Sequence, residues 1–88
     1  MKRVVIDGEK ISSMSDVHDL MSKELGFPTF YGRNLDAMYD CLTDVSSEAE
    51  IVVENFEKLE YELGKYASII LRVLEDAAEV NDKIKVIM

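Results

Sequence analysis

Three short runs of apolar residues lie along the 88-residue chain, within the ranges 2–7, 50–54 and 83–88. Each run is rich in valine and isoleucine and is bounded by charged or turn-forming residues, which predicts a strand. The first run, Val4-Val5-Ile6, is continuous rather than alternating. Continuous apolarity is typical of a strand that is covered on both faces or lies in the centre of a sheet. We therefore expect the first strand to be covered or central.

Between the first two runs, apolar residues recur every three or four positions, which is the period of a helix. One helix is expected to begin after an N-cap at Ser13 or Ser15 and to end before Gly26. A second helix is expected to begin after Asn34, another good N-cap, and to end near Asp44. A short aromatic loop that contains one proline and one glycine joins the two helices.

Two further helices are expected before the last strand. Asn55 can cap a short helix that Gly64 closes, and a longer helix follows over residues 66–80. Asn81 is expected to end the longer helix in the left-handed conformation. Strands that are joined by helical crossovers pair in parallel. We therefore predict an α/β fold in which a small three-stranded parallel sheet is packed with four helices, as a single domain over residues 1–88.

The composition is that of a globular protein, with 48% hydrophobic and 32% charged residues. The single cysteine, Cys41, has no partner for an internal disulfide, which fits a reducing compartment. The first apolar run is far too short for a secretory signal, and no segment approaches the length of a membrane span. These features predict a cytoplasmic protein with no membrane association.

The net charge of −8 comes from one third of the chain. Residues 34–62 carry nine acidic side chains and one basic side chain, Lys58, whereas the charges balance on either side of this range. The excess is either a well-solvated surface or a negative surface that steers a basic partner. Both interpretations exclude nucleic acid and anionic membranes as direct partners, because these require a basic surface.

The second predicted helix carries an unusual row of acids. Asp36, Asp40 and Asp44 follow one another at four-residue intervals, so they share one helix face. Like charges at this spacing cost about 0.2–0.5 kcal/mol per pair. A helix selected for stability alone would not carry all three. We therefore expect a group outside the helix to neutralise them.

Two chemical alternatives involve these acids or the other titratable side chains. The acids could bind a divalent metal, but metal sites usually converge from a loop or from facing helices rather than from one exposed helix row. His18 and Cys41 could form a thiol–imidazole pair, but a lone cysteine is usually a small core residue. We predict no metal, no cofactor and no enzymatic activity. His18 is expected to be a surface or capping residue, and Tyr31 a core residue.

The segment 30–43 resembles the barstar family, intracellular inhibitors of barnase-type ribonucleases. Its motif is an aromatic pair, a glycine, an asparagine and Asp-Ala, with a further aspartate four residues after the first. The similarity covers nearly the full length of the chain. It implies a barstar-like fold and inhibition by occlusion, in which the second helix and the preceding loop fill the active site of a basic, extracellular-type, barnase-like ribonuclease. The inhibitor is expected to be a monomer when free and to form a 1:1 complex.

The resemblance also implies roles for individual residues. Asp40 would be the main anchor among the basic residues of the enzyme, Asp36 would meet a second basic group, and Phe30 would stack on an active-site side chain. Binding to an Arg fork suits a carboxylate as it suits a phosphate, so the acidic helix would imitate RNA. The implied partner contacts are Phe30, Gly32, Asn34, Asp36, Tyr39, Asp40, Thr43, Asp44 and Asp76.

The chain departs from the family pattern at several positions. Arg33 replaces an acidic residue of the loop, and Asp44 replaces a glycine of the best-known member. These changes favour a cognate ribonuclease other than barnase itself. The alternative interpretation is a barstar-like interaction module whose partner is not a ribonuclease.

Overall fold

A computed structural model describes all residues of the chain, 1–88. Seven elements follow one another: β1 (Lys2–Asp7), α1 (Met14–Leu25), α2 (Leu35–Thr43), β2 (Ala49–Glu54), α3 (Phe56–Leu63), α4 (Tyr66–Val80) and β3 (Ile84–Ile87). The predicted α/β fold, with a three-stranded parallel sheet and four helices, is confirmed.

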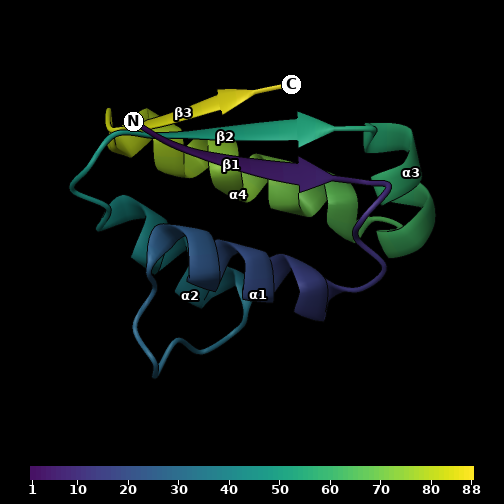
Figure 1. Cartoon of the computed structure of the whole chain (residues 1–88), viewed down its shortest axis with the longest axis horizontal. Helices are drawn as coiled ribbons and strands as arrows, with labels where there is room; N and C mark the ends of the chain where they lie inside the picture. Colours follow the sequence, from purple (N-terminus) through teal and green to yellow (C-terminus); the bar gives the residue numbers. More distant parts are fainter.

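The strands lie in the order β1-β2-β3, and both pairs are parallel. The prediction that the first strand is covered on both faces or central is wrong, because β2 is the central strand. Helices α1, α2 and α4 lie on one side of the sheet, and α3 lies beyond the carboxyl ends of β1 and β2 (Figure 1). Val4 and Ile6 therefore point into the core, whereas Val5 between them is 36% exposed.

The core is one cluster of 18 buried residues to which every strand and every helix contributes. Helix α2 packs against α4, and its two fully buried side chains are Met38 and Leu42. Because Met38 and Leu42 occupy the inner stripe of α2, the residues on the opposite side of this short helix must face outward.

Asn81 does not adopt the predicted left-handed conformation. Its φ of −132° and ψ of 104° are extended, because its side chain is used elsewhere. The amide Nδ2 donates to the backbone oxygens of Leu42 at 2.9 Å and Val45 at 3.0 Å. Asn81 therefore ties the end of α4 to the end of α2. This contact spans almost 40 residues of sequence, which is why helix-end patterns do not reveal it.

The left-handed conformation occurs instead at Asn55, with a φ of 53°. This residue precedes α3 as predicted, but its side chain makes no capping hydrogen bond. Its Nδ2 donates to Oδ1 of Asp7 at 2.7 Å and so links the end of β1 to the start of α3. No helix is both long enough and apolar enough to cross a membrane.

Candidate partner-binding surface

Helix α2 begins with a well-formed cap. Asn34 has an extended backbone, and its Oδ1 accepts the N–H of Ala37 at 2.8 Å. Asp36 lies in the first turn, where the partial positive charge of the helix end favours a carboxylate. The cap and the buried Met38 and Leu42 together fix both the start and the rotation of this helix.

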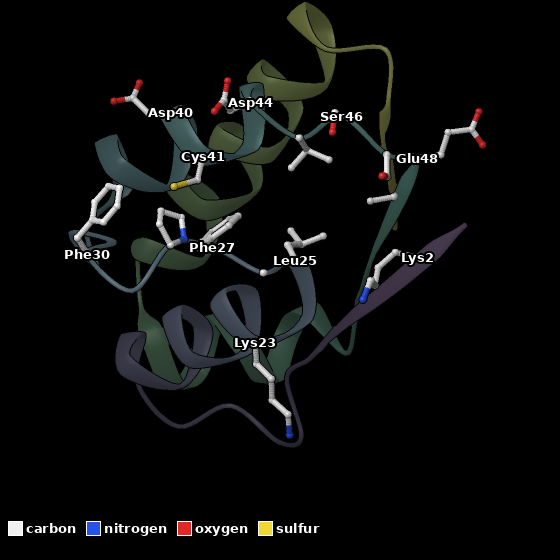
Figure 2. Close-up of a pocket in the computed structure, with 15 residues that line it drawn as sticks. Lys2, Lys23, Leu25, Phe27, Phe30, Asp40, Cys41, Asp44, Ser46 and Glu48 are labelled. Carbon is white, nitrogen blue, oxygen red and sulfur yellow. The ribbon is translucent and has the colours of Figure 1, made fainter.

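Asp36 and Asp40 of α2 and Asp44, its C-cap, are all exposed. None of them forms an ion pair or a side-chain hydrogen bond within the chain, since the ion pairs are Arg3–Glu50, Arg33–Asp19 and Lys58–Glu62. The side chains of Asp40 and Asp44 point the same way, out from the body (Figure 2). No group of this protein therefore neutralises the acid row, which we define as Asp36, Asp40 and Asp44.

The two neighbouring aromatic residues of the loop have opposite environments. Phe30 is 85% exposed, and it stands at the same side of the molecule as Asp40 (Figure 2). Tyr31 is buried, as predicted, and its ring contacts Phe27 edge-on with centroids 4.9 Å apart. Gly32 follows and is exposed; a Cβ there would lie 3.3 Å from the side chain of Ala37. The loop thus displays one ring and buries the other.

The remaining residues of the predicted contact set are arranged around α2 and α4. Tyr39 and Thr43 are half-buried, and Tyr39 packs against the core. The hydroxyl of Thr43 donates to the backbone oxygen of Asp40 at 3.0 Å. Asp76 is exposed on α4, and no hydrogen bond or ion pair connects it with α2. The structure thus places eight of the nine residues on α2, its caps and the preceding loop, and one on another element.

A groove of about 580 Å³ lies beside the acid row, between the loop after α1, helix α2 and the segment before β2. Leu25, Phe27 and Cys41 lie in its centre (Figure 2). Asp40 and Asp44 stand on one side of it, and Lys2 and Lys23 on the other. The groove therefore has an apolar centre, with Lys2 and Lys23 across from Asp40 and Asp44, and a further acid, Glu48, on the segment before β2 (Figure 2). Sequence reasoning had not identified it.

No hydrogen bond joins Cys41 to His18, whose Nδ1 faces Tyr31 instead. Burial raises the pKa of the Cys41 thiol, and the neighbouring Asp40 and Asp44 raise it further, so the thiol stays protonated. His18 is only 5% exposed, and its Nδ1 lies 2.6 Å from the hydroxyl of Tyr31. The expectation of a surface or capping histidine is wrong, because this face of α1 packs against the aromatic loop. Burial lowers the pKa of His18, and the positive charge of Arg33 lowers it further.

No three His, Cys, Asp or Glu side chains are grouped so that they could hold a metal ion. The acid row is a line on one helix rather than a convergent set.

Arg33 appeared in the sequence as a change of charge facing the partner. In the structure its side chain contacts α1 instead. Its guanidinium contacts α1, with Nη1 donating to Oδ1 of Asp19 at 2.7 Å and Nη2 to Oγ of Ser15 at 2.8 Å. These partners are 14 and 18 residues away in the sequence. Opposite charge is the one sequence signal for the contact with Asp19, and it does not distinguish Asp19 from the many other acids.

A three-stranded parallel sheet that is packed with four helices, and that displays an acidic helix beside an aromatic loop, defines a barstar-like α/β protein. The family model described as "Barstar (barnase inhibitor)" matches residues 1–88. The chain therefore belongs to the barstar family. It is similar to a Bacillus subtilis (strain 168) protein named "Putative ribonuclease inhibitor YrdF", with 40% identity over 90 residues that cover 100% of this chain and 99% of that protein.

Proposed function

We propose that this protein inhibits a basic ribonuclease by filling its active site with α2 and the loop that precedes it. Membership of the barstar family and the name of the B. subtilis relative support the inhibitor role. The observation that carries the mechanism is the acid row. Three exposed carboxylates repel one another on one helix and find no counter-charge in the chain, so the counter-charge comes from a partner.

The chemistry of a ribonuclease site matches this surface. An enzyme that binds RNA needs a concave, basic site for phosphates. A carboxylate accepts two parallel hydrogen bonds from a guanidinium, as a phosphate does. In this proposal Asp40 is the central anchor, Asp36 meets a second cation, and the exposed ring of Phe30 stacks on a side chain of the enzyme. Gly32, Asn34, Tyr39, Thr43, Asp44 and Asp76 extend the contact.

The proposed complex is 1:1, the free inhibitor is a monomer, and the protein itself performs no catalysis. We place it in the cytoplasm, which its single unpaired thiol fits. Asp44 adds a negative charge where the best-known member of the family has a glycine. A ribonuclease with one more basic group facing this position, rather than barnase itself, is therefore the proposed partner.

Capture from an extract of the source cells tests the function. A ribonuclease from the extract is expected to bind to the immobilised protein. Its activity is measured with a fluorogenic oligoribonucleotide after elution. The variant Asp36→Asn/Asp40→Asn is expected to retain far less. The matched variant Glu57→Gln/Glu60→Gln removes the same charge from exposed positions of α3 and should behave as the wild type. A captured protein without ribonuclease activity would instead favour the interaction module with another partner.

Asp40 is predicted to be a binding hot spot. It lies in the middle of the acid row and beside the groove, so in the proposed complex its carboxylate would stand near the centre of the contact. Asp40→Ala should raise the dissociation constant at least about 30-fold, or about 2 kcal/mol. Glu60→Ala, which makes the same change in net charge on α3, should stay within about twofold, since remote exposed charges contribute little. Equal effects of the two variants in a titration of ribonuclease activity would remove Asp40 as the anchor.

A further inference from the structure

We propose that Arg33 is a positioning residue: its guanidinium holds the loop that displays Phe30 against α1, so that the binding surface is ordered before the partner arrives. The effect of this ordering on inhibition rests on the proposed function, whereas the ordering itself concerns the free protein. The two are therefore tested by separate measurements.

The loop between α1 and α2 has little backbone support of its own. It projects from the body of the molecule on the side away from the sheet (Figure 1). Its backbone hydrogen bonds include Phe27 N–H to Ser22 O at 3.1 Å and Tyr31 N–H to Pro28 O at 2.9 Å. A projecting loop with so few bonds is expected to be mobile unless side chains hold it. Its conformation therefore depends on side-chain anchors.

One anchor holds the middle of the loop. Tyr31 is buried, and its hydroxyl lies 2.6 Å from Nδ1 of His18 on α1. This contact fixes Tyr31. Of the residues that follow, Asn34 is held as the N-cap of α2, and Gly32 is held by a long bond from Nδ2 of Asn34 to its backbone oxygen, at 3.4 Å. The cap at Asn34 and the buried side chains of α2 hold the helix itself. The connection between Tyr31 and Asn34 is therefore the part of the loop that still needs an anchor.

Arg33 provides the second anchor. Its fork reaches three acceptors on α1: Oδ1 of Asp19 at 2.7 Å, Oγ of Ser15 at 2.8 Å and the backbone oxygen of Ser15 at 3.3 Å. Its φ is +53°, a conformation that is uncommon for a residue with a Cβ. Three bonds from one side chain hold this unfavourable backbone angle, which turns the chain into the extended N-cap of α2. Arg33 thus joins the start of α2 to α1.

The same contacts neutralise the charge of Arg33 on the surface that would face the partner. Asp19 pairs with the guanidinium at 2.7 Å, so the positive charge is compensated within the protein. The two interpretations of Arg33 therefore predict opposite effects of one substitution on affinity. If Arg33 were a free positive charge that repels a basic enzyme, Arg33→Gln would tighten the complex. If Arg33 holds the loop, Arg33→Gln loosens the surface and weakens the complex.

The first measurement uses the free protein. Amide hydrogen exchange by NMR should be at least about tenfold faster at Phe27 and Tyr31, the loop amides that make backbone hydrogen bonds, in Arg33→Gln than in the wild type, with the core strands unchanged. Arg72→Gln is the matched control, because the side chain of Arg72 is exposed on α4 and makes no hydrogen bond or ion pair. Unchanged loop exchange in Arg33→Gln would overturn the proposal, whether or not a ribonuclease binds.

The second measurement uses the ribonuclease activity captured from the source-cell extract. Arg33→Gln should raise the dissociation constant about tenfold, and Arg72→Gln should not. Asp19→Asn should weaken binding too. The double variant Asp19→Asn/Arg33→Gln should bind no more weakly than Arg33→Gln alone, because the two substitutions remove the same contact. Tighter binding by Arg33→Gln, or additive effects, would overturn the positioning role. If the wild type binds no ribonuclease, the proposed function fails, and the exchange measurement alone decides whether Arg33 orders the loop.

Discussion

The opposite burial of Phe30 and Tyr31 shows how single residues shape this surface. The two are neighbours in sequence and alike in hydrophobic character, yet one is buried and the other is 85% exposed. The hydroxyl of Tyr31 has a partner in the interior, because Nδ1 of His18 lies 2.6 Å from it. A buried tyrosine usually needs such a partner. Phe30 lies at the surface beside it, so the loop displays one ring and buries the next.

The contact between His18 and Tyr31 predicts a pH dependence of stability. Burial lowers the pKa of His18 in the folded protein below its ordinary value of about 6.5. As the pH falls below 6.5, the unfolded chain binds a proton that the folded protein does not, so the free energy of unfolding decreases. This contribution is complete above pH 6.5 and is lost between 6.5 and the lowered pKa.

Urea unfolding between pH 7.5 and 5.5 measures this effect. The wild type should lose stability over this range, and His18→Gln should show a flatter dependence. The carboxyl groups of Asp7 and Asp16, whose pKa values are lowered by hydrogen bonds, change the stability only below about pH 5, outside this range, and do not interfere. Equal slopes for the two proteins would show that His18 is protonated with the same pKa in both states.

At the scale of elements, α1 and α2 begin in closely similar ways. Ser13 accepts the N–H of Asp16 at 3.4 Å, and Asp16 in turn binds the N–H of Ser13 at 3.2 Å, which forms a capping box. Asn34 caps α2 with one such bond, to Ala37. The two caps differ in position, since only that of α2 adjoins the acid row. They can therefore separate the stability of a helix from its role in binding.

We predict that Asn34→Ala and Ser13→Ala each lower the free energy of unfolding by about 1 kcal/mol. For a domain of this size the thermal midpoint should fall by roughly 4–8 °C. Only Asn34→Ala should also weaken ribonuclease inhibition, because α2 frays where Asp36 and the loop must hold their places. Calorimetry and an inhibition titration check the pair. Equal losses of inhibition would mean that global stability, rather than the start of α2, limits binding.

For the whole molecule, charge is distributed unevenly over the fold. The sequence carries a net charge of −8, and the exposed acid row lies on one helix that packs against α4 on the side of the sheet where α1 also lies (Figure 1). A basic enzyme approaching this helix is attracted over a distance of about 8–10 Å at ordinary ionic strength. In the proposed complex, the charge would therefore act on association before any contact is made.

The association rate of the ribonuclease complex is accordingly predicted to fall at least about tenfold between 50 mM and 500 mM salt, whereas the dissociation rate changes little. Stopped-flow mixing at several salt concentrations measures both rates. Asp36→Asn/Asp40→Asn should have a shallower salt dependence than the wild type, and Glu57→Gln/Glu60→Gln should retain the full dependence. A flat association rate for the wild type would exclude electrostatic steering.

Much of this protein could be predicted from local patterns. The seven elements, their order, the caps Ser13 and Asn34, and the exposed acids of α2 all depend on residues within one or two helical turns of each other. Periodicity and capping chemistry act over that range, so these features can be predicted from neighbouring residues alone.

What only the tertiary structure decided depends on residues that are distant in sequence. The place of β1 at the sheet edge, the use of Asn81 to tie α4 to α2, the burial of His18 and the contact of Arg33 with α1 are such cases. Each satisfies a polar group or covers an apolar one with a partner that local pattern does not specify. An unpaired buried polar group costs free energy wherever its partner lies in the chain. For that reason the sequence determined which surface would be acidic, and the folded contacts determined how the loop beside it is held.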